Sequence, residues 1–284
     1  MSEPLRFAKY QASGNDFLIV DELPGPAPPF DVPALCDRWL GVGADGVIRV
    51  SSGTSAPFRF ALTNADGSPA AVSGNGLRCL GAYLFDGGHF SGEELDVETP
   101  AGLRHVALDL KEGRAVGATV GMGTPAFTRS AIPMAGPAWE TFQQQPLDVG
   151  GGLVVQATAL SMGNPHVVLF VPEDPERYHV EHIGPAIERD ALFPERTNVE
   201  FVQVRDGEIA ARVWERGVGE TLACGTGACA VAVAANEAGM VPPTVTVRFP
   251  GGALTVERRG DGQVVLGGPV AHVFDGVADP GTLT

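Results

Sequence analysis

The chain has 284 residues, of which 44% are hydrophobic and 19% charged, so it is long enough for two ordinary domains and too apolar to be disordered. Its formal net charge of −15 argues against a nucleic-acid partner, because binding to phosphates depends on lysine and arginine. No apolar run approaches the roughly 18 residues of a membrane span, and no signal peptide is visible, which together predict a cytoplasmic protein with no membrane partner.

The first half of the chain predicts short strands, glycine turns and two helices. Residues 5–23 predict two strands around a Gly-Asn turn, and residues 33–52 a short helix, a glycine turn and a strand. Residues 58–72 predict two strands around the turn NADG, and residues 74–88 a helix that ends at two glycines. Several short strands are expected between residues 91 and 122.

The second half repeats this plan. A segment rich in proline and glycine places a domain junction near residues 123–126. Strands are expected within 153–171 and a helix near 182–189. Residues 208–239 predict strand, turn, short strand and helix, and residues 252–277 predict hairpins.

Two glycine motifs mark the repeat, SGNG beginning at Ser73 and CGTG beginning at Cys224. Asn64 precedes Ser73 by nine residues, and Glu215 precedes Cys224 by the same nine. Both stretches read as strand, polar turn, short strand and helix, so a duplicated α/β unit is the simplest account. Two such halves facing each other would bring two helix N-termini to one cleft.

A helix N-terminus offers unpaired N–H groups and partial positive charge, which together hold a carboxylate well. A cysteine at such an end is expected to be a thiolate, because the helix end lowers its pKa. A thiolate on one face of a carbon and an acid on the other would invert that carbon without a cofactor. The alternative is that the glycines reflect only tight packing and capping, and that the cysteine is inert.

Six motifs then give the chain a specific resemblance: SGNDFLIVD, NADGS, SGNGLRC, SMGNPH, PERTNVEF and ERGVGETLACGTGA. Their order and spacing resemble those of the diaminopimelate epimerase family, over residues 6 to 275. The resemblance implies an α/β (α+β) fold of two pseudo-symmetric domains, each a curled mixed β-sheet around a central helix. The implied domains are residues 1–124, with the C-terminal strand 268–284 returning to them, and residues 125–267.

The family inverts one α-carbon of diaminopimelate with two cysteines and without pyridoxal phosphate. The resemblance therefore implies that Cys224 is one catalytic cysteine and that Ser73 stands at the position of the other. By the same resemblance His166 and Glu215 tune the cysteine protonation states. The implied substrate-binding residues are Asn15, Asn64, Gly74, Asn75, Asn164, Asn198, Glu215, Arg216, Gly225 and Thr226.

No cofactor or metal is expected. The two lysines, Lys9 and Lys111, lie in no persuasive pocket motif for a Schiff base, which agrees with the absence of pyridoxal phosphate. The motif GVGADG at 41–46 fits GxGxxG, but it follows a helix and precedes a strand, the reverse of a dinucleotide-binding turn. The motif HVEH at 179–182 lacks a third metal ligand at suitable spacing. A homodimer is expected from the family alone.

Ser73 changes the expected chemistry, because a serine hydroxyl needs a partner base before it can accept or transfer a proton. Three explanations remain open: a substitution that silences the enzyme or prevents a disulfide, a diverged enzyme that works slowly through Ser73 or a water, or a changed reaction with Cys224 as sole base. A non-catalytic amino-acid-binding protein is the alternative of a different class. The resemblance implies impaired epimerisation of LL-diaminopimelate to meso-diaminopimelate, a step toward lysine and peptidoglycan precursors.

Overall fold

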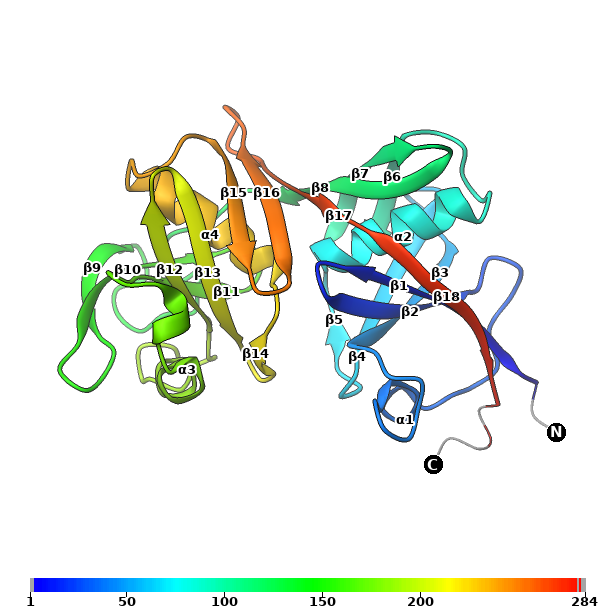
Figure 1. Ribbon diagram of the computed structural model, residues 1–284, viewed down its shortest axis with the longest axis horizontal. Coiled ribbons are helices and arrows are strands. Elements are labelled where there is room, and N and C mark those ends of the chain that lie inside the picture. The colour runs from blue at the N-terminus through cyan, green and yellow to red at the C-terminus, as the bar shows by residue number, and fades with distance from the viewer. Residues whose placement is uncertain (1–2, 280, 282–284) are drawn as a thin grey trace. The chain divides into compact units, whose positions relative to one another are not determined.

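The computed structural model describes residues 3–279 and residue 281 (Figure 1). The chain forms two compact units. The N-terminal unit runs up to Gly121 and also holds the residues from Gly267 onward, and the C-terminal unit is Met122–Leu266. From the sequence we predict one domain of residues 1–124 with 268–284 and a second domain of residues 125–267. These bounds describe two functional halves and stay a prediction.

The N-terminal unit is mostly strands with two helices, in the order that the sequence predicts for residues 5–122. Strand β18 pairs antiparallel with β1. The sequence predicts hairpins over residues 252–277, but the end of this segment pairs with a strand from the start of the chain. The elements are β1 Leu5–Ala12, β2 Asn15–Asp21, α1 Val32–Cys36, β3 Gly46–Ser52, β4 Phe58–Asn64, β5 Pro69–Ala70, α2 Gly74–Asp86, β6 Glu94–Thr99, β7 Gly102–Lys111, β8 Arg114–Gly123 and β18 Ala271–Ala278.

The C-terminal unit has the same composition of elements. The helix predicted near 182–189 is α3, and the helix that follows the CGTG motif is α4. The elements are β9 Phe142–Asp148, β10 Val154–Ser161, β11 Pro165–Phe170, the 3₁₀ turn η1 Pro175–Arg177, α3 Val180–Glu188, β12 Asn198–Arg205, β13 Glu208–Glu215, β14 Gly219–Thr221, α4 Gly225–Glu237, β15 Thr244–Phe249 and β16 Gly252–Arg258. Strand β17, Val264–Pro269, begins in this unit and ends after its last residue, Leu266.

Strand pairing shows the duplication directly. In the N-terminal unit β2 pairs parallel with β3, β3 antiparallel with β4, and β4 both antiparallel with β5 and parallel with β6. In the C-terminal unit β11 pairs parallel with β12, β12 antiparallel with β13, and β13 both antiparallel with β14 and parallel with β15. Helices α1 and α3 occupy the two corresponding crossovers that a parallel pair requires.

Each unit holds one central helix, α2 or α4, against strands of the same unit (Figure 1). In α4 nearly every residue from Gly225 to Ala235 is buried, and most of these are glycine, alanine, valine or cysteine. A helix that is apolar on all sides is one surrounded by protein, and small side chains let the strands approach it closely. The predicted fold class, a curled mixed sheet around a central helix in each half, is confirmed.

Candidate active site

In the N-terminal unit, Ser73 is the residue immediately before helix α2. Its backbone is extended, with φ −143° and ψ 119°, and its Oγ accepts a hydrogen bond of 3.0 Å from the backbone N–H of Gly76. A Cβ added at Gly76 would lie 3.2 Å from the Phe60 ring, so the first turn of the helix is tightly packed. Ser73 therefore caps the helix, and its hydroxyl oxygen is already a hydrogen-bond acceptor.

In the C-terminal unit, Cys224 occupies the corresponding position before α4. Its backbone is again extended, with φ −124° and ψ 122°, and its Sγ lies 3.4 Å from the donating backbone N of Gly227. Oγ1 of Thr226 lies 3.5 Å from the same sulfur. The side chain is buried, and a Cβ at Gly227 would meet Oε1 of Glu200 at 3.0 Å. The sulfur thus lies close to backbone, to a hydroxyl and to a carboxyl-bearing side chain.

The residues for which the sequence predicts a carboxylate cradle are the first residues of two helices. Gly74 and Asn75 open α2, and Gly225 and Thr226 open α4. The first N–H groups of a helix have no acceptor inside it and carry partial positive charge. Each helix end, taken by itself, can therefore hold one carboxylate.

The prediction that Cys224 is a thiolate is wrong for this structure. Burial raises the pKa of its thiol well above the ordinary value, and the negative charge of Glu215 raises it further. Hydrogen bonds from Thr226 and from the Gly227 N–H act in the opposite direction but do not compensate. The effect of a helix end on a pKa is about one unit, which is smaller than the cost of placing a charge in a buried site beside carboxylates. At neutral pH Cys224 therefore keeps its proton and is a thiol.

Alkylation of Cys224 by iodoacetamide is therefore expected to be slow at pH 7 and to rise about tenfold per pH unit through pH 9, because only the thiolate reacts. Peptide mapping by mass spectrometry measures the rate, with Cys224→Ala to assign the labelled peptide. A rate at pH 7 that already equals the rate at pH 9 would show that the thiol is ionised after all.

Beside Cys224, a buried chain of hydrogen bonds begins at the fully buried residues Glu200 and His166 and runs toward the sulfur. Oε1 of Glu200 lies 2.6 Å from Nδ1 of His166, and Nε2 of His166 lies 3.0 Å from Oδ1 of Asn164. Nδ2 of Asn164 donates to Oγ1 of Thr226 at 3.4 Å. Because the amide oxygen can only accept, Nε2 carries a hydrogen, and the hydroxyl of Thr226 remains free to donate to the sulfur. The chain therefore aims donors toward Cys224.

Sequence reasoning missed Glu200, although its position carries a signal. It is a charged residue in NVEFVQV, a strand whose other members from Asn198 to Val202 are all buried. Burial raises the pKa of Glu200 above its ordinary value, and its interaction with His166 acts in the opposite direction without compensating. The pair shares one proton between Nδ1 and Oε1, so it is neutral as a whole whichever atom holds that proton. A carboxyl group in an otherwise apolar strand is costly unless it has such a partner.

Replacing Glu200 by alanine is expected to cost about 3 kcal/mol of unfolding free energy, because it leaves the polar ring of His166 buried without its partner. Glu200→Gln is expected to cost less than half of that, since its NH₂ can donate to Nδ1 of the neutral imidazole, whose hydrogen is on Nε2. Urea unfolding of the two variants measures the difference. Equal losses would show that an amide cannot replace the carboxyl group beside His166, and would contradict this prediction.

A second group of predicted residues surrounds the turn that follows β13. Nδ2 of Asn198 donates to the backbone oxygen of Pro165 at 2.8 Å, and its Oδ1 accepts from the backbone N of Arg216 at 2.8 Å. Glu215 accepts from Oγ1 of Thr221 at 2.5 Å. The Arg216 side chain is exposed, with one bond of 3.3 Å from Nη1 to the backbone oxygen of Glu195. Asn198 thus fixes the turn, and the guanidinium group of Arg216 is left able to take a carboxylate.

In the N-terminal unit the structure brings Asn15 and Asn75 together. Nδ2 of Asn75 donates to Oδ1 of Asn15 at 3.2 Å. Asn64 is the last residue of β4, and its side chain donates to Oγ of Ser68 within the NADGS turn at 3.0 Å. The three predicted asparagines therefore act in two groups, an amide pair and a turn that follows a strand.

The motif GVGADG has a structural explanation that involves no nucleotide. A Cβ at Gly41 would lie 2.2 Å from the backbone oxygen of Ala34, and a Cβ at Gly46 would lie 2.7 Å from that of Thr63. Gly46 then begins a strand, β3, whereas a phosphate-binding loop would open a helix. The glycines permit close backbone packing at both ends of this loop.

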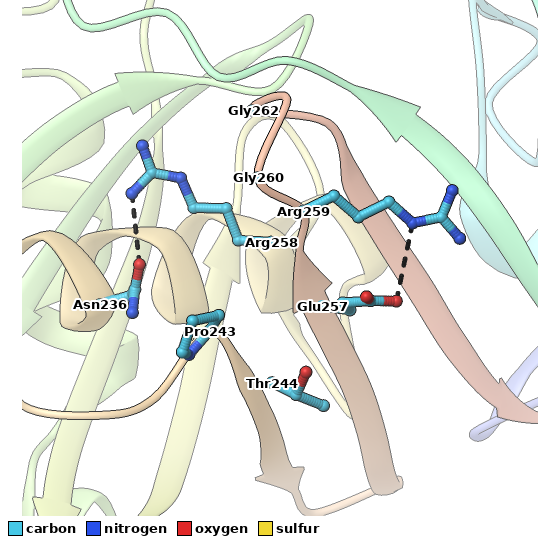
Figure 2. Close-up of a pocket in the computed structure, with 8 residues that line it drawn as sticks. All are labelled: Asn236, Pro243, Thr244, Glu257, Arg258, Arg259, Gly260 and Gly262. Carbon is cyan, nitrogen blue, oxygen red and sulfur yellow. Dashed lines mark hydrogen bonds and ion pairs between the residues drawn. The ribbon is translucent and has the colours of Figure 1, made fainter.

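A surface hollow of about 630 Å³ lies elsewhere on the C-terminal unit (Figure 2). Two arginines line it, and Figure 2 shows them pointing away from each other. Arg258 pairs with Glu237 at 2.6 Å, and Arg259 lies 3.7 Å from Glu257. Its cations already face carboxylates, and none of the predicted site residues lines it. Its lining is Asn236, Pro243, Thr244, Glu257, Arg258, Arg259, Gly260 and Gly262.

Comparison with known proteins gives a consistent result. A family model described as diaminopimelate epimerase matches residues 7–128 and 158–273. The diaminopimelate epimerases of Desulfitobacterium hafniense and Moorella thermoacetica are each 44% identical to this chain, over 96% of it and 98% of their own length.

Solved structures of more distant proteins share the fold. A hydroxyproline epimerase from Agrobacterium vitis superposes with a TM-score of 0.71 at 14% identity, covering 98% of this chain and 94% of that one. A PhzF-family phenazine biosynthesis protein from Bacillus anthracis gives a TM-score of 0.70 at 15% identity, covering 98% and 99%. At such low identity these likenesses concern architecture alone.

Proposed function

The chain belongs to the diaminopimelate epimerase family and is an isomerase, and on that premise we propose that it converts LL-diaminopimelate to meso-diaminopimelate without a cofactor. The observation that carries the proposal is Cys224, a cysteine held at the start of a buried helix in the duplicated frame. Chiral separation of diaminopimelate isomers after incubation with the protein tests it. The product supplies the synthesis of lysine and peptidoglycan precursors.

Inversion requires one group to remove the α-proton and a second group to return a proton to the opposite face of the carbon. We assign the second role to Cys224 in the LL-to-meso direction, because its raised pKa keeps the thiol protonated. The donor chain from His166 through Asn164 and Thr226 stabilises the thiolate that is left. The thiolate then serves as the base for the reverse reaction.

Ser73 is the weak member of this pair of positions. A helix end contributes about 0.3–1 kcal/mol, and one pKa unit corresponds to about 1.4 kcal/mol. That shift helps a thiol, but it leaves an aliphatic hydroxyl far from ionisation at neutral pH. We propose that the chain is for this reason a strongly impaired epimerase in which Ser73, or a water that it holds, takes the place of the second cysteine.

The other predicted residues are proposed to hold the substrate. The first N–H groups at Gly74 and Asn75, and at Gly225 and Thr226, suit the carboxylate at the reacting carbon. The planar fork of Arg216 suits bidentate capture of the distant carboxylate. The amides of Asn15, Asn64, Asn164 and Asn198, with Glu215, supply donors and acceptors for the remaining polar groups.

Two alternatives remain, a diverged isomerase with Cys224 as sole base and a non-catalytic amino-acid-binding protein. A slow-reacting thiol fits the enzyme and the binding protein equally, because the pKa of Cys224 is raised in this structure. Exchange of the α-proton with solvent separates them, since only an enzyme breaks the C–H bond.

We further propose a cytoplasmic homodimer. No helix in the described part of the chain is long and apolar enough to cross a membrane. The strand pair β1–β18 supports self-association, because Val273, Phe274 and Val277 of β18 are between 42% and 59% exposed. Apolar side chains gathered on one strand are a common feature of protein interfaces.

A further inference from the structure

The motif GVGADG contains one charged residue, Asp45, and its carboxylate accepts a hydrogen bond from the side chain of Asn15, a proposed substrate-binding residue. Oδ2 of Asp45 accepts from Nδ2 of Asn15 at 2.5 Å and from the backbone N of Asp16 at 3.0 Å. Oδ1 of Asp45 accepts from Nη2 of Arg38 at 2.7 Å. Both oxygens of the carboxylate therefore have assigned partners, and Asn15 is one of them.

The cation that holds Asp45 is itself fixed. Nη2 of Arg38 also lies 2.6 Å from Oδ1 of Asp16, and Lys9 lies 2.8 Å from Oδ2 of Asp16. Asp16 is partly buried, which by itself raises a carboxyl pKa, but the bonds from Arg38 and Lys9 outweigh burial and hold its pKa below the ordinary value. Asp16 is thus a stable anion that anchors Arg38, and Arg38 in turn anchors Asp45.

A second anchor lies at the other end of the amide pair. The fully buried Arg78 donates from Nη2 to Oδ1 of Asn75 at 2.5 Å and from Nη1 to the backbone oxygen of Pro269 at 2.8 Å. Asn75 donates to Asn15, and Asn15 donates to Asp45. All donors in this row point the same way, from a group that can only donate to a group that can only accept.

Such a row fixes the orientation of both amides. A carboxamide turned by 180° about its last bond has almost the same shape but exchanges its donor and acceptor ends. If Asn15 turned, its oxygen would face the carboxylate of Asp45 and its NH₂ would face the NH₂ of Asn75. If Asn75 turned, its NH₂ would face the guanidinium group of Arg78. Either change would set like groups against each other and leave their hydrogen bonds unmade.

We infer that Asp45 is a positioning residue for substrate binding, which holds Asn15 and through it Asn75 in one orientation before the ligand arrives. The bonds of this row use one N–H and one oxygen lone pair of each amide. The orientation of the amide then decides where its second N–H and second lone pair point, and so which ligand groups can bond to them. The amides lose their conformational freedom when the protein folds, so ligand binding does not have to order them. The inference rests on the proposed function, because it takes Asn15 to be a substrate-binding residue.

The test is isothermal titration of the full-length protein with meso-diaminopimelate. Asp45→Asn is expected to weaken binding about tenfold, the effect of one well-placed hydrogen bond, because the new NH₂ opposes either Arg38 or Asn15. In an Asn15→Ala background the same change is expected to matter less than about twofold. A merely structural role for Asp45 would give equal effects in both backgrounds.

Two further variants complete the experiment. Asp37→Asn alters a carboxylate of the same loop, one that accepts from the backbone of Trp39 and Leu40, and it is expected to leave binding unchanged. Arg38→Gln, at a half-exposed side chain, is expected to weaken binding in the same direction as Asp45→Asn and provides the test if that variant fails to fold.

The outcomes separate the two levels of the proposal. If the wild type binds diaminopimelate and Asp45→Asn binds it equally well, or weakens it equally without Asn15, the inference is overturned while the proposed function stands. If the wild type does not bind diaminopimelate, the proposed function fails, and the inference falls with it.

Discussion

Replacing Ser73 by cysteine is expected to raise the rate of interconversion of LL- and meso-diaminopimelate by about 10²–10⁴-fold, the usual contribution of a well-placed general acid or base. A cysteine thiol ionises near pH 8.5, and a helix end brings that value closer to neutrality. The hydroxyl of Ser73 instead serves as a helix cap, accepting from the N–H of Gly76. The rate is measured by chiral separation of the isomers under reducing conditions.

Two controls accompany this variant. Ser52→Cys adds a thiol at an exposed position at the end of β3 and is expected to change nothing. Ser73→Ala removes the cap at a cost of about 1 kcal/mol in stability and shows whether the hydroxyl itself takes part in the residual reaction. If Ser73→Cys folds and leaves the rate of interconversion unchanged, position 73 does not carry the missing proton transfer.

Replacing Cys224 by alanine in the Ser73→Cys background is expected to lower the rate of interconversion by about 10²–10⁴-fold. Alanine leaves no group to protonate the carbon from the Cys224 side, whereas the substrate-binding groups remain. Affinity for meso-diaminopimelate is therefore expected to change far less than the rate. Titration calorimetry and the isomer assay measure the two quantities separately.

Cys229 offers a matched control for this substitution. It is buried in the same helix, a little more than one turn after Cys224. Cys229→Ala is expected to lower stability slightly, by leaving a small cavity, and to leave the rate unchanged. Loss of activity in both variants, or in neither, would contradict the role assigned to Cys224.

Much of the fold could be predicted from the sequence, because the signals for its strands, turns and helices are local and occur twice. Asn64 and Glu215 each end a strand, and nine residues later Ser73 and Cys224 each cap a central helix, as the matched spacing predicts. The pairing of β18 with β1 could not be predicted from such local signals. It joins residues between 260 (Gln11 with Ala271) and 273 (Leu5 with Ala278) positions apart, and no local period or turn can specify that partner.

The candidate site was predicted less completely, for a physical reason. The predicted residues came from motifs, but their protonation and orientation depend on neighbours from other strands. Glu200 lies on a different strand from His166, and Asp45 lies in a loop whereas Asn15 begins β2. The thiol state of Cys224 follows from burial and from the charge of Glu215, neither of which a helix-capping motif displays.

The most direct test of this account is incubation of the unaltered protein with LL- and meso-diaminopimelate separately in D₂O, followed by measurement of deuterium at the α-carbon and of stereochemistry. The account predicts slow inversion with deuterium incorporated. Deuterium uptake from one isomer without inversion would show that Cys224 works alone. No deuterium uptake from either isomer would contradict diaminopimelate chemistry in this chain.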